Sequence, residues 1–182
     1  MPNWCANDLT VAGKPERLKE FRDFMHAPGY HGETKWLSEE KLIPYPMKFQ
    51  ELDRIAATWD AEMEKRRLAG EQVSYMERPK DGFNSGGHEW CVENWGTKWG
   101  FCHEQEPELE EFGDGEGELT YRFDTAWSPP LPLIRRMGEL FKDLTFDLRY
   151  FECGVGFNGM LRIENGEETD DRCGAYFGDR GG

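Results

Sequence analysis

Alternating apolar and polar positions predict four strands of a sheet that is buried on one face. A strand points successive side chains to opposite faces, so a period of two marks a half-buried strand. The stretches with this period are residues 3–12, 118–127, 144–150 and 157–163. The last two are joined by residues 152–156, which are too few for a parallel crossover, so we expect an antiparallel hairpin there.

Apolar residues at helical spacing predict three amphipathic helices. Their stripes are Leu18, Phe21, Phe24 and Met25 after Pro15; Phe49, Leu52, Ile55, Trp59 and Met63 within 49–68; and Leu133, Ile134, Met137, Leu140 and Phe141 after Pro130. Residues 71–89 carry Gly, Asn, Ser and Pro and are predicted as a mobile loop. Residues 48–89 are therefore interpreted as an insertion made of one helix and one loop.

The aromatic-rich stretch 91–101 fits two periods. Strand spacing separates its residues into one face with Trp95, Thr97, Trp99 and Phe101 and another with Asn94, Gly96, Lys98 and Gly100. Helical spacing also aligns Cys91, Trp95 and Trp99, but two glycines in five residues would cost a helix about 1 kcal/mol each. We therefore predict a strand, with Trp95 and Trp99 in the core.

The predicted element order is β, α, insertion, β, β, α, β, β. This order favours an α+β fold in which two helices pack on one face of an antiparallel sheet. We expect a single domain over residues 1–182 that carries the insertion 48–89 and an acidic loop at 103–118.

The net charge of the chain limits the kinds of molecule that it is expected to bind. The 182 residues contain 22 Lys and Arg against 36 Asp and Glu, a formal charge of −14. Such a chain repels nucleic acid and anionic membranes at long range. It has no apolar stretch of the roughly 18 residues that span a bilayer, and its five cysteines are scattered. We expect a cytoplasmic protein in a reducing compartment.

The acidic residues concentrate in one segment. Residues 103–118 hold eight carboxylates in sixteen positions: Glu104, Glu106, Glu108, Glu110, Glu111, Asp114, Glu116 and Glu118. Three glycines and one proline accompany them, which is typical of a solvated loop. The tail that follows Asn165 and Gly166 is also acidic and glycine-rich, and we expect it to be loosely held.

Four motifs resemble a known family. They are residues 1–7 with Asn3 and Trp4; Asn94, Trp95, Gly96, Thr97, Lys98 and Trp99; Thr125 to Trp127 with Ser128, Pro129 and Pro130; and Tyr150 and Glu152 followed by Gly156, Phe157 and Gly159. Together they resemble the YubB-type ferredoxin-like domain family, whose members are small accessory proteins of phages, prophages and plasmids. The resemblance implies a ferredoxin-like fold and a mobile-element origin, with no established activity. Gly100 and Cys153 depart from the pattern, where a polar residue and a proline are usual.

A zinc site is one chemical alternative. His88, Cys91, Cys102 and His103 offer two imidazoles and two thiolates, the ligands of tetrahedral zinc. The second pair is adjacent in sequence, however, and lacks the spacing of a zinc motif. We therefore expect no metal and no cofactor, and interpret the cysteines as small buried residues.

A small enzyme is a second alternative, with a site near Pro2, Cys5, Asn94 and Glu152. The amine of Pro2 could act as a general base if the initiator Met is removed, and Cys5 could be a nucleophile activated by His88 or His103. Glu152 has a simpler interpretation, in which a carboxylate at a hairpin accepts backbone N–H bonds.

Single-stranded nucleic acid is a third alternative, because aromatic rings on a ferredoxin-like sheet can stack on bases. The candidates are Trp95, Trp99 and Trp127. The negative charge opposes this binding, so direct nucleic-acid binding is disfavoured. The sequence instead predicts a non-enzymatic binding module whose acidic surface meets a host or anti-phage defence protein with a basic surface, without a membrane partner.

Overall fold

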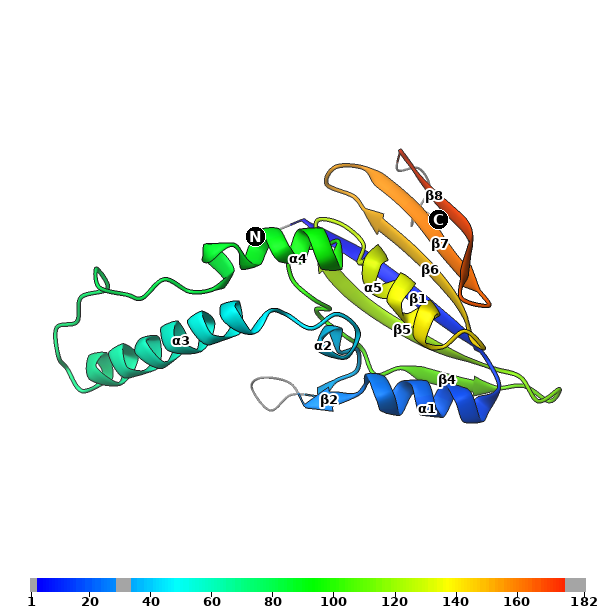
Figure 1. Ribbon diagram of the computed structural model, residues 1–182, viewed down its shortest axis with the longest axis horizontal. Helices are drawn as coiled ribbons and strands as arrows, with labels where there is room; N and C mark the ends of the chain where they lie inside the picture. The colour runs from blue at the N-terminus through cyan, green and yellow to red at the C-terminus, as the bar shows by residue number, and fades with distance from the viewer. Residues whose placement is uncertain (1–2, 29–33, 176–182) are drawn as a thin grey trace. The chain divides into compact units, whose positions relative to one another are not determined.

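The computed structural model describes residues 3–28 and 34–175. The chain divides into two compact units, one formed by 1–44 and 92–182 and the other by 45–91. The first unit contains a six-stranded antiparallel sheet in the order β4-β5-β1-β6-β7-β8 (Figure 1).

The eight strands found in the described residues all lie in the first unit. They are β1 (Trp4–Gly13), β2 (Ala27–Pro28), β3 (Thr34–Lys35), β4 (Glu108–Glu111), β5 (Gly117–Ala126), β6 (Thr145–Glu152), β7 (Phe157–Glu164) and β8 (Glu167–Ala175). The helices are α1 (Pro15–Met25), α2 (Glu39–Leu42), α3 (Met47–Leu68), α4 (Gly87–Trp95) and α5 (Leu131–Leu140), with a 3₁₀ turn η1 (Phe83–Ser85). Helix α3 and η1 belong to the second unit, and α4 spans the boundary.

The connectivity of the first unit is ferredoxin-like. Strand β1 lies between β5 and β6, and β5 separates it from β4. Helix α1 connects β1 towards β4, and α5 connects β5 to β6, so each helix returns the chain across the same sheet face (Figure 1). This is the split βαβ arrangement, extended by β7 and β8. The predicted α+β class, with two helices on one face, is confirmed.

One face of this sheet is the core. Alternate residues of β1 and β5 are buried, and Leu9 of β1 is opposite Tyr121 of β5. Phe21 of α1 packs edge-to-face against Tyr121 and Phe146, with ring centroids 6.1 Å and 5.5 Å apart. The helix stripes and the strand alternation therefore bury the same layer of side chains, which is why both periods could be recognised in the sequence.

The prediction of a strand at 91–101 is wrong. Residues 87–95 form helix α4, and the chain bends without regular structure from Gly96 to Gly100. Gly96 has a φ of +78°, the left-handed conformation that commonly terminates a helix. The glycine that seemed to argue against a helix is therefore the residue that ends it.

Two acidic segments predicted as irregular contain strands. Residues 108–111 form β4, an edge strand paired with β5, and residues 167–175 form β8, paired with β7. Asn165 and Gly166, with φ values of +55° and +80°, make the turn before β8. Edge strands tolerate charged side chains because one side of the strand stays in water, so backbone pairing overrides the composition in both segments.

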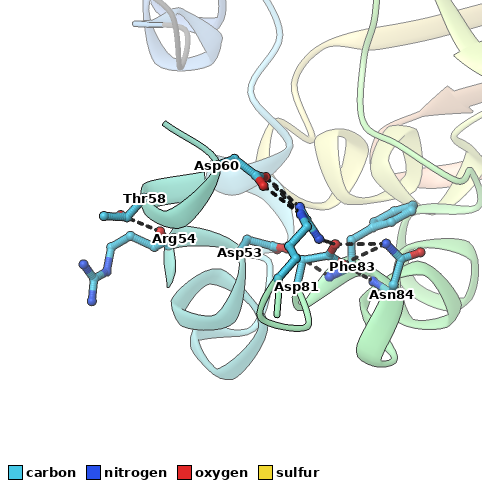
Figure 2. Close-up of polar contacts among 8 residues, drawn as sticks. Asp53, Arg54, Thr58, Asp60, Asp81, Phe83 and Asn84 are labelled. Atoms are coloured by element: carbon cyan, nitrogen blue, oxygen red, sulfur yellow. Dashed lines mark hydrogen bonds and ion pairs between the residues drawn. The ribbon is translucent and has the colours of Figure 1, made fainter. Parts of the chain in front are cut away.

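The second unit is built around α3. Figure 2 shows how polar contacts attach the following segment to this helix: the Asp53 carboxylate accepts the Phe83 backbone N–H at 3.0 Å, and Asp81 accepts the Asn84 N–H at 2.7 Å. Arg78 donates to Asp60 of α3 at 2.8 Å. Part of the predicted loop 71–89 is therefore attached to α3, and its end already belongs to α4. In the described residues, no helix is sufficiently long and apolar to cross a membrane.

Candidate functional site

The second and third sequence motifs interlock at one end of the sheet. The Thr97 hydroxyl donates to the Ala126 carbonyl at 2.9 Å, and the Ser128 hydroxyl donates to the Gly96 carbonyl at 2.6 Å. A side chain at Gly96 would collide with Pro132, since an added Cβ would lie 2.7 Å from it. These residues hold a turn against the sheet.

The first motif contacts both the third and the fourth motif at the same end. The Asn7 amide, on the buried face of β1, donates to the Thr125 hydroxyl at 3.0 Å, and the Trp127 N–H donates to the Asn3 carbonyl at 3.0 Å. Strand pairing places Ala6 opposite Phe151, next to Glu152. Four motifs scattered along the chain thus form one cluster, which we call the motif end.

The Glu152 carboxylate is occupied by its own hairpin. It is 1% exposed and accepts the backbone N–H groups of Gly154 and Val155 at 2.7 Å and 2.5 Å. Its two oxygens therefore cap the turn between β6 and β7. This geometry agrees with the structural interpretation of Glu152.

The tryptophans of the motif end differ in exposure. Trp95 is 6% exposed, and its indole N–H donates to the Ile43 carbonyl at 2.8 Å. Trp99 is half-buried, and its ring centroid lies 6.1 Å from that of Trp4. Trp127 is 45% exposed, so the core expectation does not extend to it. The Lys98 ammonium lies 4.9 Å from the Trp99 ring and 4.7 Å from the Trp127 ring.

None of the three candidate tryptophans lies in a strand. Trp95 ends α4, Trp99 follows it in the bend, and Trp127 follows β5. The base-stacking hypothesis requires rings on the sheet surface, and the secondary structure does not place these rings there.

The structure describes three of the four candidate catalytic residues, Cys5, Asn94 and Glu152. Cys5 is fully buried, and burial raises the pKa of its thiol to about 12, so the thiol stays protonated at neutral pH. Asn94 lies in the last turn of α4, and Pro2 lies outside the described residues. Of the proposed zinc ligands, His88 and Cys91 belong to the second unit and Cys102 and His103 to the first. Within 3–28 and 34–175, no three His, Cys, Asp or Glu side chains are grouped to hold a metal.

Most of the acidic segment, residues 108–118, comprises β4, the turn after it and the first two residues of β5. We call these residues the acidic hairpin. Two of its carboxylates have cationic partners: Glu108 pairs with Arg122 at 3.0 Å, and Glu111 pairs with Lys19 of α1 at 2.6 Å. The other four have no cationic partner among the described residues. They are Glu110, Asp114, Glu116 and Glu118.

Two of these unpaired carboxylates are directly opposite each other. Glu110 of β4 is the register partner of Glu118 of β5, on the sheet face that the helices leave open. Like charges opposite each other destabilise a strand pair. Asp114 and Glu116 lie in the exposed turn. The acidic hairpin thus holds negative charge that the rest of the described chain does not neutralise.

Glu104 lies in a different environment from the acidic hairpin. Its Oε2 atom accepts the backbone N–H groups of Trp36 and Leu37 at 2.7 Å and 2.6 Å. Burial raises the pKa of Glu104 to about 7, even though these two N–H groups and Lys35 lower it. Glu104 therefore anchors the segment before α2 to the sheet edge and titrates near neutral pH. Glu106 is exposed.

Sequence reasoning missed Lys35 and Glu39, which lie beside Glu104. The Lys35 ammonium donates to both Glu39 carboxylate oxygens at 2.5 Å. The spacing of four residues was available as a signal, but residues 34–38 lack helical periodicity and the pair was not weighed. With Ser38, Cys102 and His103, these residues line a pocket of about 670 Å³.

One family model matches the chain. The model for the ferredoxin-like domain in Api92-like protein covers residues 95–177, which include α5 and β4 to β8. No curated protein matches.

Among solved structures, the crystal structure of a protein api92 from Yersinia pseudotuberculosis is similar, with a TM-score of 0.54 and 12% sequence identity. The match covers 98% of this chain and 99% of that chain. At this identity the likeness shows a shared fold only. The chain thus contains a ferredoxin-like domain of unknown function, and neither comparison names an activity.

Proposed function

We propose that the protein is an accessory protein of a phage or plasmid and acts without catalysis, as an acidic binding module. Its partner is a host or defence protein with a basic surface, such as a nucleic-acid-binding surface, in the host cytosol. The acidic hairpin is the contact surface in this proposal.

The observation that carries the proposal is the pairing of Glu110 with Glu118. Two carboxylates opposite each other on an exposed face raise the free energy of the free protein. A cationic partner would relieve this repulsion, so part of the binding energy is already present in the unbound state. The charge would also speed association, because complementary potentials steer the encounter.

The mobile-element origin is supported by the four motifs that resemble the YubB-type family. Their residues meet at the motif end, where the Asn7 amide donates to the Thr125 hydroxyl and the Thr97 and Ser128 hydroxyls donate to backbone carbonyls. Polar groups that satisfy each other inside the fold stabilise that fold rather than a ligand. This arrangement favours a scaffold role for the shared motifs and leaves binding to the exterior.

Affinity capture from bacterial lysate with two matched variants tests the proposal. The hairpin variant neutralises the four unpaired carboxylates: Glu110→Gln, Asp114→Asn, Glu116→Gln and Glu118→Gln. The control variant neutralises four exposed carboxylates elsewhere: Glu16→Gln, Glu62→Gln, Glu77→Gln and Glu93→Gln. Both change the net charge by the same amount, so a general charge effect would appear equally in the two.

The proposal predicts a partner that the intact chain and the control variant capture at about 50 mM salt and lose at about 500 mM. The hairpin variant should fail to capture it at either concentration. Equal capture by the two variants, or capture insensitive to salt, would show that the acidic residues serve solubility or protect the sheet edge.

A further inference from the structure

The pocket beside Glu104 has the dimensions and composition of a small-molecule site. Its volume of about 670 Å³ falls within the range of ligand pockets in proteins. It is lined by residues of the first unit within 27–28, 34–40 and 101–104, and combines buried Phe101 with charged and hydroxyl groups. The pocket is separate from the four unpaired carboxylates of the acidic hairpin.

Glu104 presents a fixed carboxylate with one oxygen unused. Both backbone N–H bonds go to Oε2, which fixes the orientation of the group. Within residues 3–28 and 34–175, Oε1 accepts no hydrogen bond, and Glu104 lines the pocket. A carboxylate held through one oxygen can offer the other to a ligand without losing its anchor.

Among the described residues that line the pocket, the one lysine, Lys35, already has an anionic partner. Lys35 donates to both oxygens of Glu39, and the pair is largely buried, with side chains 26% and 13% exposed. Gly100 makes room for this pair, because any Cβ at position 100 would collide with the Glu39 carboxylate. Since Glu39 uses the charge of Lys35, ionised Glu104 keeps a net negative charge in the pocket.

Ser38 provides a further polar group. It lines the pocket, is 5% exposed, and its hydroxyl makes no capping bond to the backbone of α2. A hydroxyl at a pocket wall that does not cap its own helix can donate to or accept from a ligand atom. Ionised Glu104 would repel an anionic ligand. A neutral ligand would leave the negative charge of Glu104 without a counter-charge.

We propose that this pocket binds a small organic amine, with the ammonium group on Oε1 of Glu104, a short apolar stem along Phe101, and Ser38 as an additional hydrogen-bonding group. Binding then requires Glu104 to be ionised and the amine to be protonated. Burial raises the pKa of Glu104 to about 7, so affinity should rise as pH increases through 7.

Three probes of similar size test the charge preference: n-butylamine, butyrate and n-butanol, added to the intact protein and followed by NMR chemical shifts of backbone amides. Butylamine at about pH 8 should shift the amides of the pocket with a Kd on the order of 1 mM. At about pH 5.5 the affinity should fall at least about tenfold, because Glu104 is protonated there. Butyrate and butanol should not saturate.

The Glu104→Gln variant tests the role of the carboxylate in amine binding separately from its role in holding the fold. Its amide oxygen can still accept both backbone N–H groups, but the second oxygen becomes an NH₂ donor. The variant should keep its fold by circular dichroism and lose at least about tenfold in butylamine affinity. The matched control is Glu106→Gln, two residues along the same segment. Gly100→Ala should weaken butylamine binding, because the added Cβ would displace Glu39.

Unchanged butylamine binding by Glu104→Gln, equal binding of butyrate, or no saturation by butylamine would overturn the proposal. The hairpin variant should bind butylamine like the intact chain. The pocket and the partner surface are thus tested separately, and one can fail while the other holds.

Discussion

The motif end and the acidic hairpin lie on the same sheet but differ in where their polar groups find partners. At the motif end, Thr97 and Asn7 are buried, and each donates to a partner within the fold. On the acidic hairpin, Glu110 and Glu118 are directly opposite and have no cationic partner among the described residues. The motif end pairs these buried donors within the fold, although the Asn7 Oδ1 atom is buried without a hydrogen-bond partner among the described residues. The acidic hairpin leaves charge available to a binding partner.

This difference indicates where stability and recognition are located. Buried polar groups are costly when unpaired, so internal pairing identifies a region that specifies the fold. Exposed charges contribute little to stability, so a repulsive pair can persist at small cost. Substitutions should therefore reduce stability at the motif end and change association at the acidic hairpin.

The largest expected effect is at Trp95. Trp95→Ala should lower the free energy of unfolding by about 3–5 kcal/mol, because it removes a buried indole and its bond to the Ile43 carbonyl. Trp127→Ala, at the 45% exposed ring, should cost about 1 kcal/mol or less. Urea denaturation measures both, and equal losses would remove the distinction between scaffold and surface.

The pH dependence of stability should identify Glu104. Its pKa is raised to about 7 in the folded chain, against an ordinary value of 4.5. Between these values the folded state holds a proton that the unfolded state has released, so the free energy of unfolding falls as pH rises from about 4.5 to 7. The fall attributable to Glu104 is at most about 3 kcal/mol.

Glu104→Gln should flatten that part of the profile, measured by denaturation at several pH values. The Glu106→Gln profile should match that of the intact chain. If Glu104→Gln retains the full slope, the proton responsible belongs to another group.

A smaller effect is expected at Thr97. Thr97→Val keeps the shape of the side chain and removes the bond to the Ala126 carbonyl, which should cost about 1–3 kcal/mol. Thr120→Val, on the open sheet face, should cost less than about 0.5 kcal/mol. Thermal unfolding compares the two, and a neutral Thr97→Val would mean that this bond does not hold the motifs together.

The smallest effect has the opposite sign. Glu118→Gln should stabilise the chain by about 0.2–1 kcal/mol, because it removes the repulsion with Glu110. A double-mutant cycle with Glu110→Gln isolates the pair, and its coupling energy should vanish at high salt. A coupling energy that is favourable between Glu110 and Glu118 would contradict repulsion between these two carboxylates.

The core of the first unit could be predicted from the sequence because burial repeats with the period of the element. Strand β5, predicted at 118–127 and observed at Gly117–Ala126, alternates apolar and polar residues, and the α5 stripe fits a helix. Strand β8 could also have been found, since Asn165 and Gly166 are a strong hairpin signal.

Features decided by backbone pairing or long-range contacts could not be predicted. Strand β4 exists because β5 supplies its hydrogen bonds, although its residues are mostly acidic. Glu104 became a half-buried anchor because it accepts the backbone N–H groups of Trp36 and Leu37, which lie 68 and 67 positions away in the sequence. No local pattern distinguishes it from Glu106, so only the fold separates the two carboxylates.

The most direct test of the central claim is the association rate of a captured partner as a function of salt. For the intact chain the rate should fall at least about tenfold between about 50 mM and 500 mM salt. The hairpin variant should associate slowly at low salt and show little salt dependence, while Trp127→Ala should behave like the intact chain. A hairpin variant that associates at the intact rate, with Trp127→Ala impaired, would place recognition at the motif end and contradict the account.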